Sequence, residues 1–246
     1  MAGALSSPLL EAHGFRHAFF TREGGVSEGA YASLNFSVGA GDRPERVAEN
    51  LARARSALGV DALYFLSQVH GRVVVEVDPS EPPDAFVRRE GDAVISRARG
   101  AAACVRVADC APVLIAGRSS GAVAAVHAGW RGAVAGVVTR AVERLRAAVG
   151  EEPLVAAIGP HIGVGAFELG EEVAAEIARA ARVEVIDRSR ARPHADLRAM
   201  LAAELAALGA EVDHVEGCTY SDAARFFSYR RDGRASGRHL AAIAPR

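Results

Sequence analysis

Short apolar segments that alternate with longer amphipathic segments constrain the fold of this chain more than any other feature. Helical periodicity marks four segments: residues 43–58, 133–149, 170–181 and 195–208. Nine shorter segments are apolar, rich in β-branched residues and bounded by glycine or proline, as buried strands are: residues 17–22, 72–77, 92–97, 102–107, 112–117, 121–127, 153–159, 183–187 and 239–245. Strands interleaved with helices predict an α/β fold, a single-domain layered sandwich with mixed β-sheets and flanking helices. The neighbouring segments 102–107 and 112–117 also predict a hairpin.

No internal repeat, low-complexity tract or Ser/Pro-rich linker divides the chain, so residues 1–246 are expected to form one domain. The net charge is −1, whereas binding to nucleic acid or to an anionic membrane needs a basic excess, so neither is an expected partner. No stretch approaches the roughly 18 apolar residues of a membrane span, and the N-terminus has no signal-peptide pattern. We therefore expect a cytoplasmic protein, with a monomer as the default state.

Three residues that commonly bind metals stand at the ends of apolar segments. His70 lies in "QVHG" before a predicted strand, Cys110 lies in "ADCAP" between two strands, and His127 ends the strand before "AGWRG". Residues at strand ends converge in a crevice of many α/β folds. Two imidazoles and one thiolate suit Zn²⁺, and three protein ligands leave the open position of a catalytic site.

The spacing of these three residues is equally consistent with structural roles. A single cysteine beside apolar strands is usually a small buried hydrophobic residue, and isolated histidines are mostly structural or exposed. The chain has no C-x-x-C or H-x-x-H pair that would indicate a metal site by spacing alone. The sequence pattern alone therefore does not decide whether these three residues pack in the core or bind a metal.

The turn after His127 is rich in glycine. Gly129 and Gly132 allow a sharp passage from strand to helix, which would expose amide groups at a helix N-terminus as a cradle for an anion such as phosphate. Arg131 could add a charge-assisted contact to that anion. An ordinary strand-to-helix turn with Trp130 packed over the core explains the pattern equally well.

Several longer motifs resemble one family, and they occur nearly end to end in the chain: "FTREGGVSEGAYASLNFSVGAGD" (20–42), "QVHG" (68–71), "ADCAPVLI" (108–115), "HAGWRG" (127–132), "AIGPHIG" (157–163) and "FFSYRRDGRASGRHLAAI" (226–243). Together they resemble the YfiH family, also called the laccase-domain or polyphenol oxidase family, whose members are described as purine nucleoside phosphorylases.

The resemblance implies a metal site, usually zinc, built by His70, Cys110 and His127. It also implies that these residues support phosphorolysis of adenosine, inosine and S-methyl-5′-thioadenosine to the free base and a ribose 1-phosphate, with adenosine deamination as a second activity. Purine nucleosides and phosphate are then the expected small-molecule partners.

Arginines are the expected phosphate ligands because a guanidinium binds an oxyanion through two parallel hydrogen bonds. Arg22 in "FTREGG" and Arg131 are the first candidates, followed by Arg230 and Arg231 in "SYRRDG". Each of these arginines could equally be a surface or ion-pair residue. Asn35, which is polar between apolar neighbours, would hydrogen-bond a substrate hydroxyl or cap a loop.

Other functions compete with this one. Cys110 and His127 could form a metal-free hydrolase pair that edits a peptidoglycan precursor, an activity also linked to the family. A copper-dependent polyphenol oxidase is disfavoured, although Cu²⁺ could bind the three ligands: the only methionines are Met1 and Met200, and no H-x-H pair occurs. A partner-binding module with structural zinc is also disfavoured, because structural zinc normally has four protein ligands.

Overall fold

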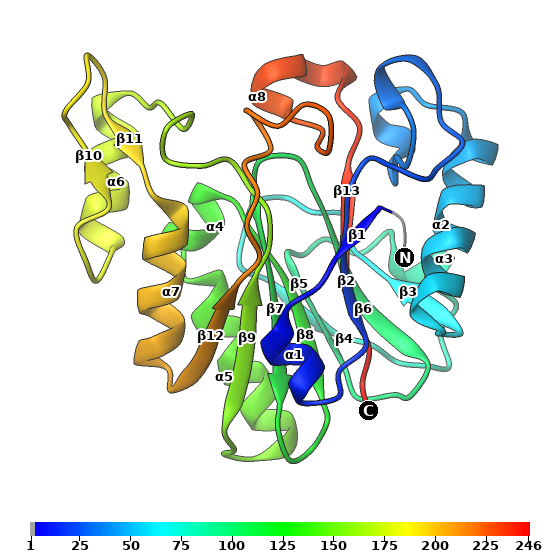
Figure 1. Cartoon of the computed structure of the whole chain (residues 1–246). Helices are drawn as coiled ribbons and strands as arrows, with labels where there is room; N and C mark the ends of the chain where they lie inside the picture. Colours follow the sequence, from blue (N-terminus) through cyan, green and yellow to red (C-terminus); the bar gives the residue numbers. More distant parts are fainter. Residues whose placement is uncertain (1–2) are drawn as a thin grey trace.

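Two β-sheets pack face to face in the computed structural model of the chain, which describes residues 3–246, and helices cover the outer face of each sheet (Figure 1). One sheet has the strand order β1 (Ala4–Leu5), β2 (His17–Phe20), β13 (His239–Ile243), β6 (Ala101–Val107) and β3 (Ala62–Tyr64). The other has the order β12 (Ala210–His214), β9 (Leu154–Ile158), β7 (Ala111–Gly117), β8 (Val123–Ala128), β5 (Ala93–Ser96) and β4 (Val74–Glu76). We call them the first and second sheet.

Both sheets are mixed. The pairs β3–β6, β4–β5 and β9–β12 are parallel and the remaining neighbours are antiparallel. A separate antiparallel ribbon joins β10 (Ile186–Asp187) to β11 (His194–Ala195). The predicted class, a layered α/β sandwich with mixed sheets and flanking helices, is confirmed.

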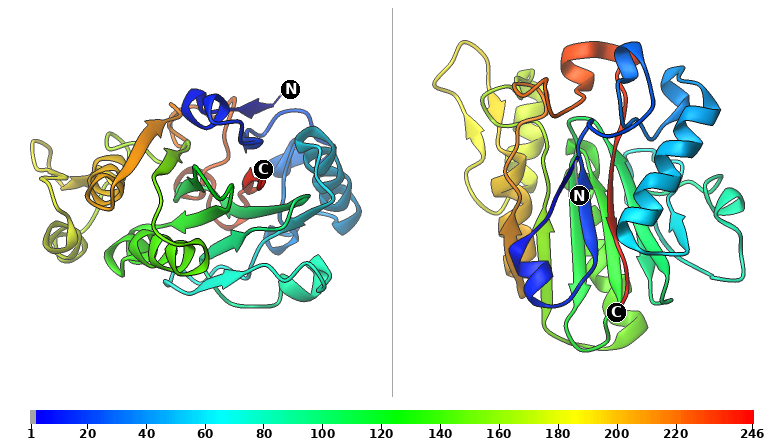
Figure 2. Two further views of the ribbon diagram at one scale, coloured as in Figure 1. Left: turned by 90° about the horizontal axis from the view of Figure 1, so that it is seen from below. Right: turned by 45° about the vertical axis from the view of Figure 1, so that its right-hand side comes forward.

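The helices divide between the two outer faces and the loops, as the view from below shows (Figure 2). Helix α2 (Pro44–Leu58) covers the first sheet, and α5 (Val137–Val149) and α7 (Leu197–Ala207) cover the second. The remaining helices are shorter or peripheral: α1 (Pro8–Ala12), α3 (Pro83–Phe86), α4 (Trp130–Val134), α6 (Glu171–Ala180) and α8 (Tyr229–Asp232). Three 3₁₀ turns complete the chain, Gly29–Tyr31, Val38–Ala40 and Gly233–Ala235.

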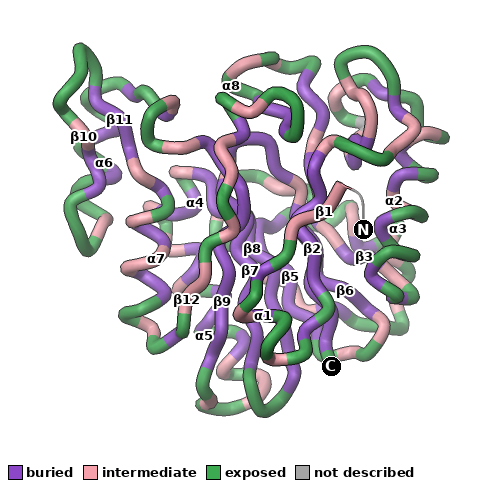
Figure 3. The backbone as a smooth tube through the Cα atoms, in the orientation of Figure 1, coloured by how far each residue is buried: buried purple, intermediate pink, exposed green. Residues whose placement is uncertain are grey.

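Strand alternation explains why the chain forms layers. In β6, Ala103 and Val105 point between the sheets, whereas Ala102 and Cys104 face the α2 side. In β7, every residue is buried, because one face contacts the first sheet and the other contacts α5 and α7. The buried strands therefore lie at the centre of the molecule, and the exposed faces of the helices lie at its outside (Figure 3).

Each of the nine predicted strands overlaps a strand of the structure, and each predicted helix overlaps a helix. The short strands β1, β3, β11 and β12 were not predicted. The predicted helix 133–149 is in fact two helices, α4 and α5, because Gly136 takes a left-handed conformation with φ of 77° between them.

The predicted hairpin of 102–107 and 112–117 is wrong. Strand β6 belongs to the first sheet and β7 to the second, and the antiparallel partner that follows β7 is β8. The connection Ala108–Cys110 crosses between the sheets, with Asp109 at a φ of 86°. Long-range hydrogen bonds hold that crossing, since the Asp109 carboxylate accepts from the Thr219 hydroxyl and from the Arg230 amide, both at 2.6 Å.

Among residues 3–246, no helix combines the length and the apolar character that crossing a bilayer requires.

Buried histidines are expected to make the fold acid-sensitive. Burial lowers the pKa of His239 from 6.5 to about 3, and its Nε2 accepts a hydrogen bond from the Phe227 amide at 2.9 Å. Because the unfolded chain takes up this proton below pH 6.5 and the folded chain does not, the free energy of unfolding falls by about 2 kcal/mol between pH 6.5 and pH 5. Urea unfolding at these pH values measures the loss.

Replacing His239→Gln removes the titrating group while keeping an acceptor, so the variant should lose about that much pH dependence. The matched control His214→Gln changes an exposed histidine and should keep the wild-type dependence. Equal slopes of unfolding free energy against pH in wild type and His239→Gln would contradict the assignment of this pH dependence to His239.

Candidate metal site and its cavity

The structure brings together the three predicted ligands. His70, Cys110 and His127 each offer one ligand atom, and these atoms all lie within 4.8 Å of one another. The Cys110 Sγ lies 3.8 Å from the His70 Nε2, and the two imidazole rings meet edge to face with centroids 4.8 Å apart. Three donors converging on one point is the arrangement that a metal ion requires.

Each ligand comes from a different part of the fold. His127 lies in β8 and is 3% exposed, Cys110 ends the crossing between the two sheets, and His70 lies in the loop before β4. His70 has a φ of 60°, which is rare for a residue with a side chain. Conformations of this kind persist where the surroundings impose them, and they concentrate at functional sites.

Asp92 holds both histidines in place. Its carboxylate accepts hydrogen bonds from the His127 Nδ1 at 2.8 Å and from the amides of His70 and Gly71 at 2.9 and 2.7 Å. Because Nδ1 of His127 donates to Asp92, its Nε2 is left to face the cluster, as in many carboxylate–histidine–metal sites. The Val69 amide adds a longer hydrogen bond of 3.3 Å, and because Asp92 is 1% exposed, these four donors compensate its buried charge.

Sequence reasoning missed Asp92. The available signal was an acidic residue directly before a buried strand, in "GDAVIS", but such residues are common and most of them are solvated.

Gly129 leaves room for the cluster. A Cβ atom at this position would lie 2.9 Å from the Cys110 Sγ and 3.0 Å from the His70 Cδ2. Its φ of −72° is open to any residue, so the close approach of the two ligands, not backbone conformation, requires glycine here. Gly129 precedes the single-turn helix α4.

Cys110 and His127 shift each other's pKa in opposite directions. Against the effect of burial, the charge of Cys110 and hydrogen bonds with Asp92 and Cys110 raise the pKa of His127 to about 9, so a metal that binds here displaces a proton from its imidazole. Burial alone would raise the pKa of Cys110, but the neighbouring charge of His127 and hydrogen bonds from both histidines lower it to about 6. Burial likewise raises the pKa of Asp92, yet its hydrogen bonds with His127 and Gly71 outweigh this and the pKa is lowered. Cys110 is therefore available as the thiolate, which is the form that ligates metals.

The cluster lies in a cavity of about 800 Å³, within the range typical of small-molecule sites. The apolar part of its lining comes from α4, α6 and the loop before α6: Trp130, Ile162, Phe167, Leu169 and Val173. The polar part of its lining includes residues of the first sheet and its loops: Ser37, Gln68, Arg106 and Arg238. Tyr229 and Arg230 of α8, both exposed, also line the cavity.

The predicted substrate residues divide into two groups. Arg131 and Arg230 line the cavity. Arg22 and Asn35 are not among its lining residues: the Arg22 guanidinium donates to the carbonyls of Ala32 and Ala223, and the buried Asn35 side chain bonds Ser37 and Asp42. Arg231 is also bound to loop carbonyls and to Asp232. Sequence reasoning missed Arg106 and Arg238.

A second cavity, of about 510 Å³, lies beside His161 and Cys218 and shares no lining residue with the first. It contains none of the predicted site residues.

An α/β sandwich with an open site of two histidines and one cysteine describes a class of candidate metalloenzymes. The chain belongs to the multi-copper polyphenol oxidoreductase laccase family, whose profile matches residues 16–246. Similar proteins are named purine nucleoside phosphorylase. One from Deinococcus radiodurans is 40% identical over 241 residues, covering 96% of this chain and 92% of the relative. YfiH of Escherichia coli, another protein of that name, is 38% identical over 220 residues, covering 86% of each.

Solved structures agree with this assignment. Neisseria meningitidis protein NMB0706 superposes with a TM-score of 0.86 at 33% identity, covering 99% of each chain. The Bacillus licheniformis protein YfiH has a TM-score of 0.89 at 22% identity, covering 96% of this chain and 94% of its own, which supports the fold.

Replacing Asp92→Asn should lower zinc affinity about 10–100-fold, because His127 loses the carboxylate that orients it and the His70 loop loses its anchor. Competition with a chromogenic chelator measures the affinity. Glu90→Gln, an exposed change in the same segment, is the control. Unchanged zinc affinity in Asp92→Asn would show that the carboxylate does not organise the ligands.

Gly129→Ala should also lower zinc affinity, since its methyl group displaces Cys110 and His70. Gly170→Ala is a closely matched control: Gly170 precedes α6 with nearly the same backbone angles, and nothing lies within 4 Å of its Cβ position. The same chelator assay should find wild-type affinity in Gly170→Ala. Equal affinities in the two variants would contradict the steric argument.

Proposed function

We propose that the protein is a zinc-dependent purine nucleoside phosphorylase with residues 1–246 as one catalytic domain. It would cleave adenosine, inosine and S-methyl-5′-thioadenosine: a phosphate oxygen bonds to C1′ of the sugar, the bond from C1′ to N9 breaks, and N9 takes up a proton. The products are the free base and the corresponding ribose 1-phosphate. Adenosine deamination in the same cavity is a proposed second activity.

The observation that carries the proposal is that the three-ligand cluster lies in one cavity whose lining includes both aromatic residues and arginines. A purine ring is flat and apolar on its faces, and phosphate is a compact anion, so the cavity offers each a matching environment. The names of the similar proteins add independent support.

In this proposal His70, Cys110 and His127 hold the metal, and Asp92 keeps the two histidines oriented. Zinc when bound would supply a Lewis acid beside the reacting centre. Trp130 and Phe167 would contact the base, because both are aromatic and belong to the apolar lining of the cavity. Arg131 and Arg230, which line the cavity and are exposed, would attract the anionic phosphate towards it through their positive charge.

The low pKa of Cys110 favours one rival, a metal-free Cys110–His127 hydrolase acting on an amide of a peptidoglycan precursor. This rival predicts activity after complete metal removal and its loss on alkylation of Cys110. The phosphorylase proposal predicts loss of activity on chelation and recovery on adding zinc. Metal analysis of the purified protein also tests zinc against copper.

The test incubates metal-quantified protein with adenosine, with and without phosphate, and separates the products by liquid chromatography. Adenine and ribose 1-phosphate should appear only with phosphate, and His127→Ala should lower the rate about 100-fold or more because a metal ligand is lost. Gly170→Ala serves as the active control. Inosine formed regardless of phosphate would make deamination the main activity, and intact adenosine in every sample would overturn the proposal.

A further inference from the structure

Two arginines of the polar lining of the cavity are neighbours on one face of the first sheet. Arg106 lies in β6 opposite Leu240 of β13. Arg238 directly precedes β13, two residues from Leu240, so the register places it diagonally across from Arg106 on the same face. Diagonal neighbours of this kind are about 7–8 Å apart, within reach of two long side chains. Both line the cavity that contains the metal cluster.

Neither guanidinium has a carboxylate partner among the described residues, where the ion pairs within 4.0 Å involve other arginines. Asp109, whose charge acts on Arg238, uses its two oxygens to accept from Thr219 and Arg230. Two half-buried like charges without a counterion are costly, which is why buried charges are normally paired.

Both arginines are anchored but keep free donors. The Arg106 Nη2 donates to the Leu66 carbonyl at 3.2 Å and its guanidinium lies 4.5 Å over the Phe65 ring. The Arg238 Nη1 donates to the carbonyls of Ser236 and Gly237 at 2.7 and 2.9 Å. The Nε and Nη2 groups of Arg238 remain, and this edge of a guanidinium is the one that binds two oxygens of an oxyanion.

The electrostatics of the pair agree with its geometry. Burial, followed by the charge of Arg238, lowers the pKa of Arg106. Burial lowers the pKa of Arg238 more than the charges of Cys110 and Asp109 raise it. A bound anion between the two guanidiniums would stabilise their charged forms and so oppose the lowering of both pKa values.

The other cavity arginines are less suited to this role. Arg131 is exposed and lies 4.4 Å over the Trp130 ring, and Arg230 is exposed and donates to the Glu168 carbonyl. Water screens exposed charges, so a half-buried pair attracts an anion more strongly.

We infer that Arg106 and Arg238 form a binding site for a tetrahedral oxyanion, of which inorganic phosphate is the example tested, within the cavity that contains the metal cluster. Its role as the site of the attacking phosphate rests on the proposed function, whereas its existence as an oxyanion site does not.

Calorimetric titration of the purified, metal-loaded protein with inorganic phosphate tests the inference without any nucleoside. Wild type should bind phosphate, and Arg106→Gln and Arg238→Gln should each weaken binding about tenfold or more. Arg238→Lys, which keeps the charge but loses the two-donor edge, should also bind more weakly than wild type. The control Arg140→Gln changes an exposed arginine paired with Glu143 and should bind as wild type does.

Thermal melting with and without phosphate separates binding from a merely structural role. Arg106→Gln removes a like-charge contact but also the bond to the Leu66 carbonyl and the contact with Phe65, so the readout is the rise in melting temperature that phosphate causes. At equal phosphate concentration this rise should be smaller in Arg106→Gln than in wild type. The inference would be overturned if both glutamine variants bound phosphate as tightly as wild type, which is also the result expected if only the metal binds phosphate. It would likewise be overturned if wild type bound no detectable phosphate.

The two proposals fail in different ways. If phosphate binding depends on Arg106 and Arg238 but the protein leaves adenosine intact, the oxyanion site is supported and the phosphorylase proposal is wrong. Phosphate-dependent adenine release that is equally fast in both glutamine variants would keep the phosphorylase and remove the site.

Discussion

The Asp92 carboxylate is the interaction on which the candidate site depends. It fixes His127 through the ring and the His70 loop through three backbone amides, so one buried charge sets the positions of two candidate ligands that come from different segments. The backbone contributes as well, because the His127 amide donates to the Asp92 carbonyl across β5 and β8. The positive φ of His70 is sustained by the same carboxylate, and it directs the imidazole towards Cys110.

The crossing between the sheets supplies the third ligand. Cys110 directly follows Asp109, whose carboxylate connects the crossing to Thr219 and to the first turn of α8. A hairpin at this position would have paired β6 with β7 in one sheet. The crossing instead places Cys110 between a strand of each sheet, and the lining of the cavity comes from elements of both sheets and from loops.

The sequence predicted what depends on local pattern. The apolar segments located the ends at which His70, Cys110 and His127 stand, and motif resemblance then identified the three as a metal site. Asp92, Arg106 and Arg238 were missed because their roles come from long-range neighbours: the first is one acid among many before strands, and the pair forms only when β6 and β13 align. The hairpin prediction failed for the same reason, since hydrogen bonds to residues far along the chain determine the path at Asp109.

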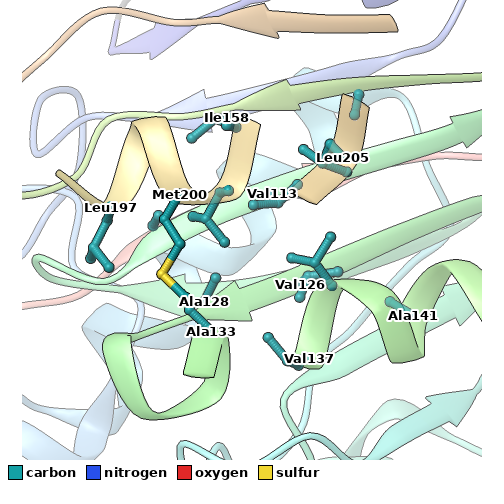
Figure 4. Close-up of a cluster of buried hydrophobic side chains, with 14 of the residues drawn as sticks. Val113, Val126, Ala128, Ala133, Val137, Ala141, Ile158, Leu197, Met200 and Leu205 are labelled. Carbon is teal, nitrogen blue, oxygen red and sulfur yellow. The ribbon is translucent and has the colours of Figure 1, made fainter. Parts of the chain in front are cut away.

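The cavity also bears on the oxidase activity that the family description suggests. Met200 of α7 packs among apolar residues beside Ala133, so it is part of the core beneath α4 (Figure 4), and Met1 lies outside the described residues. His17 and His239 accept hydrogen bonds from backbone amides in the protein interior, which occupies the nitrogen that a metal would need. An uncharged phenol would gain little from two unpaired guanidiniums, whereas an anionic substrate would gain the compensation that both lack. The two guanidiniums therefore match an anionic substrate better than a neutral phenol, whichever metal His70, Cys110 and His127 would hold.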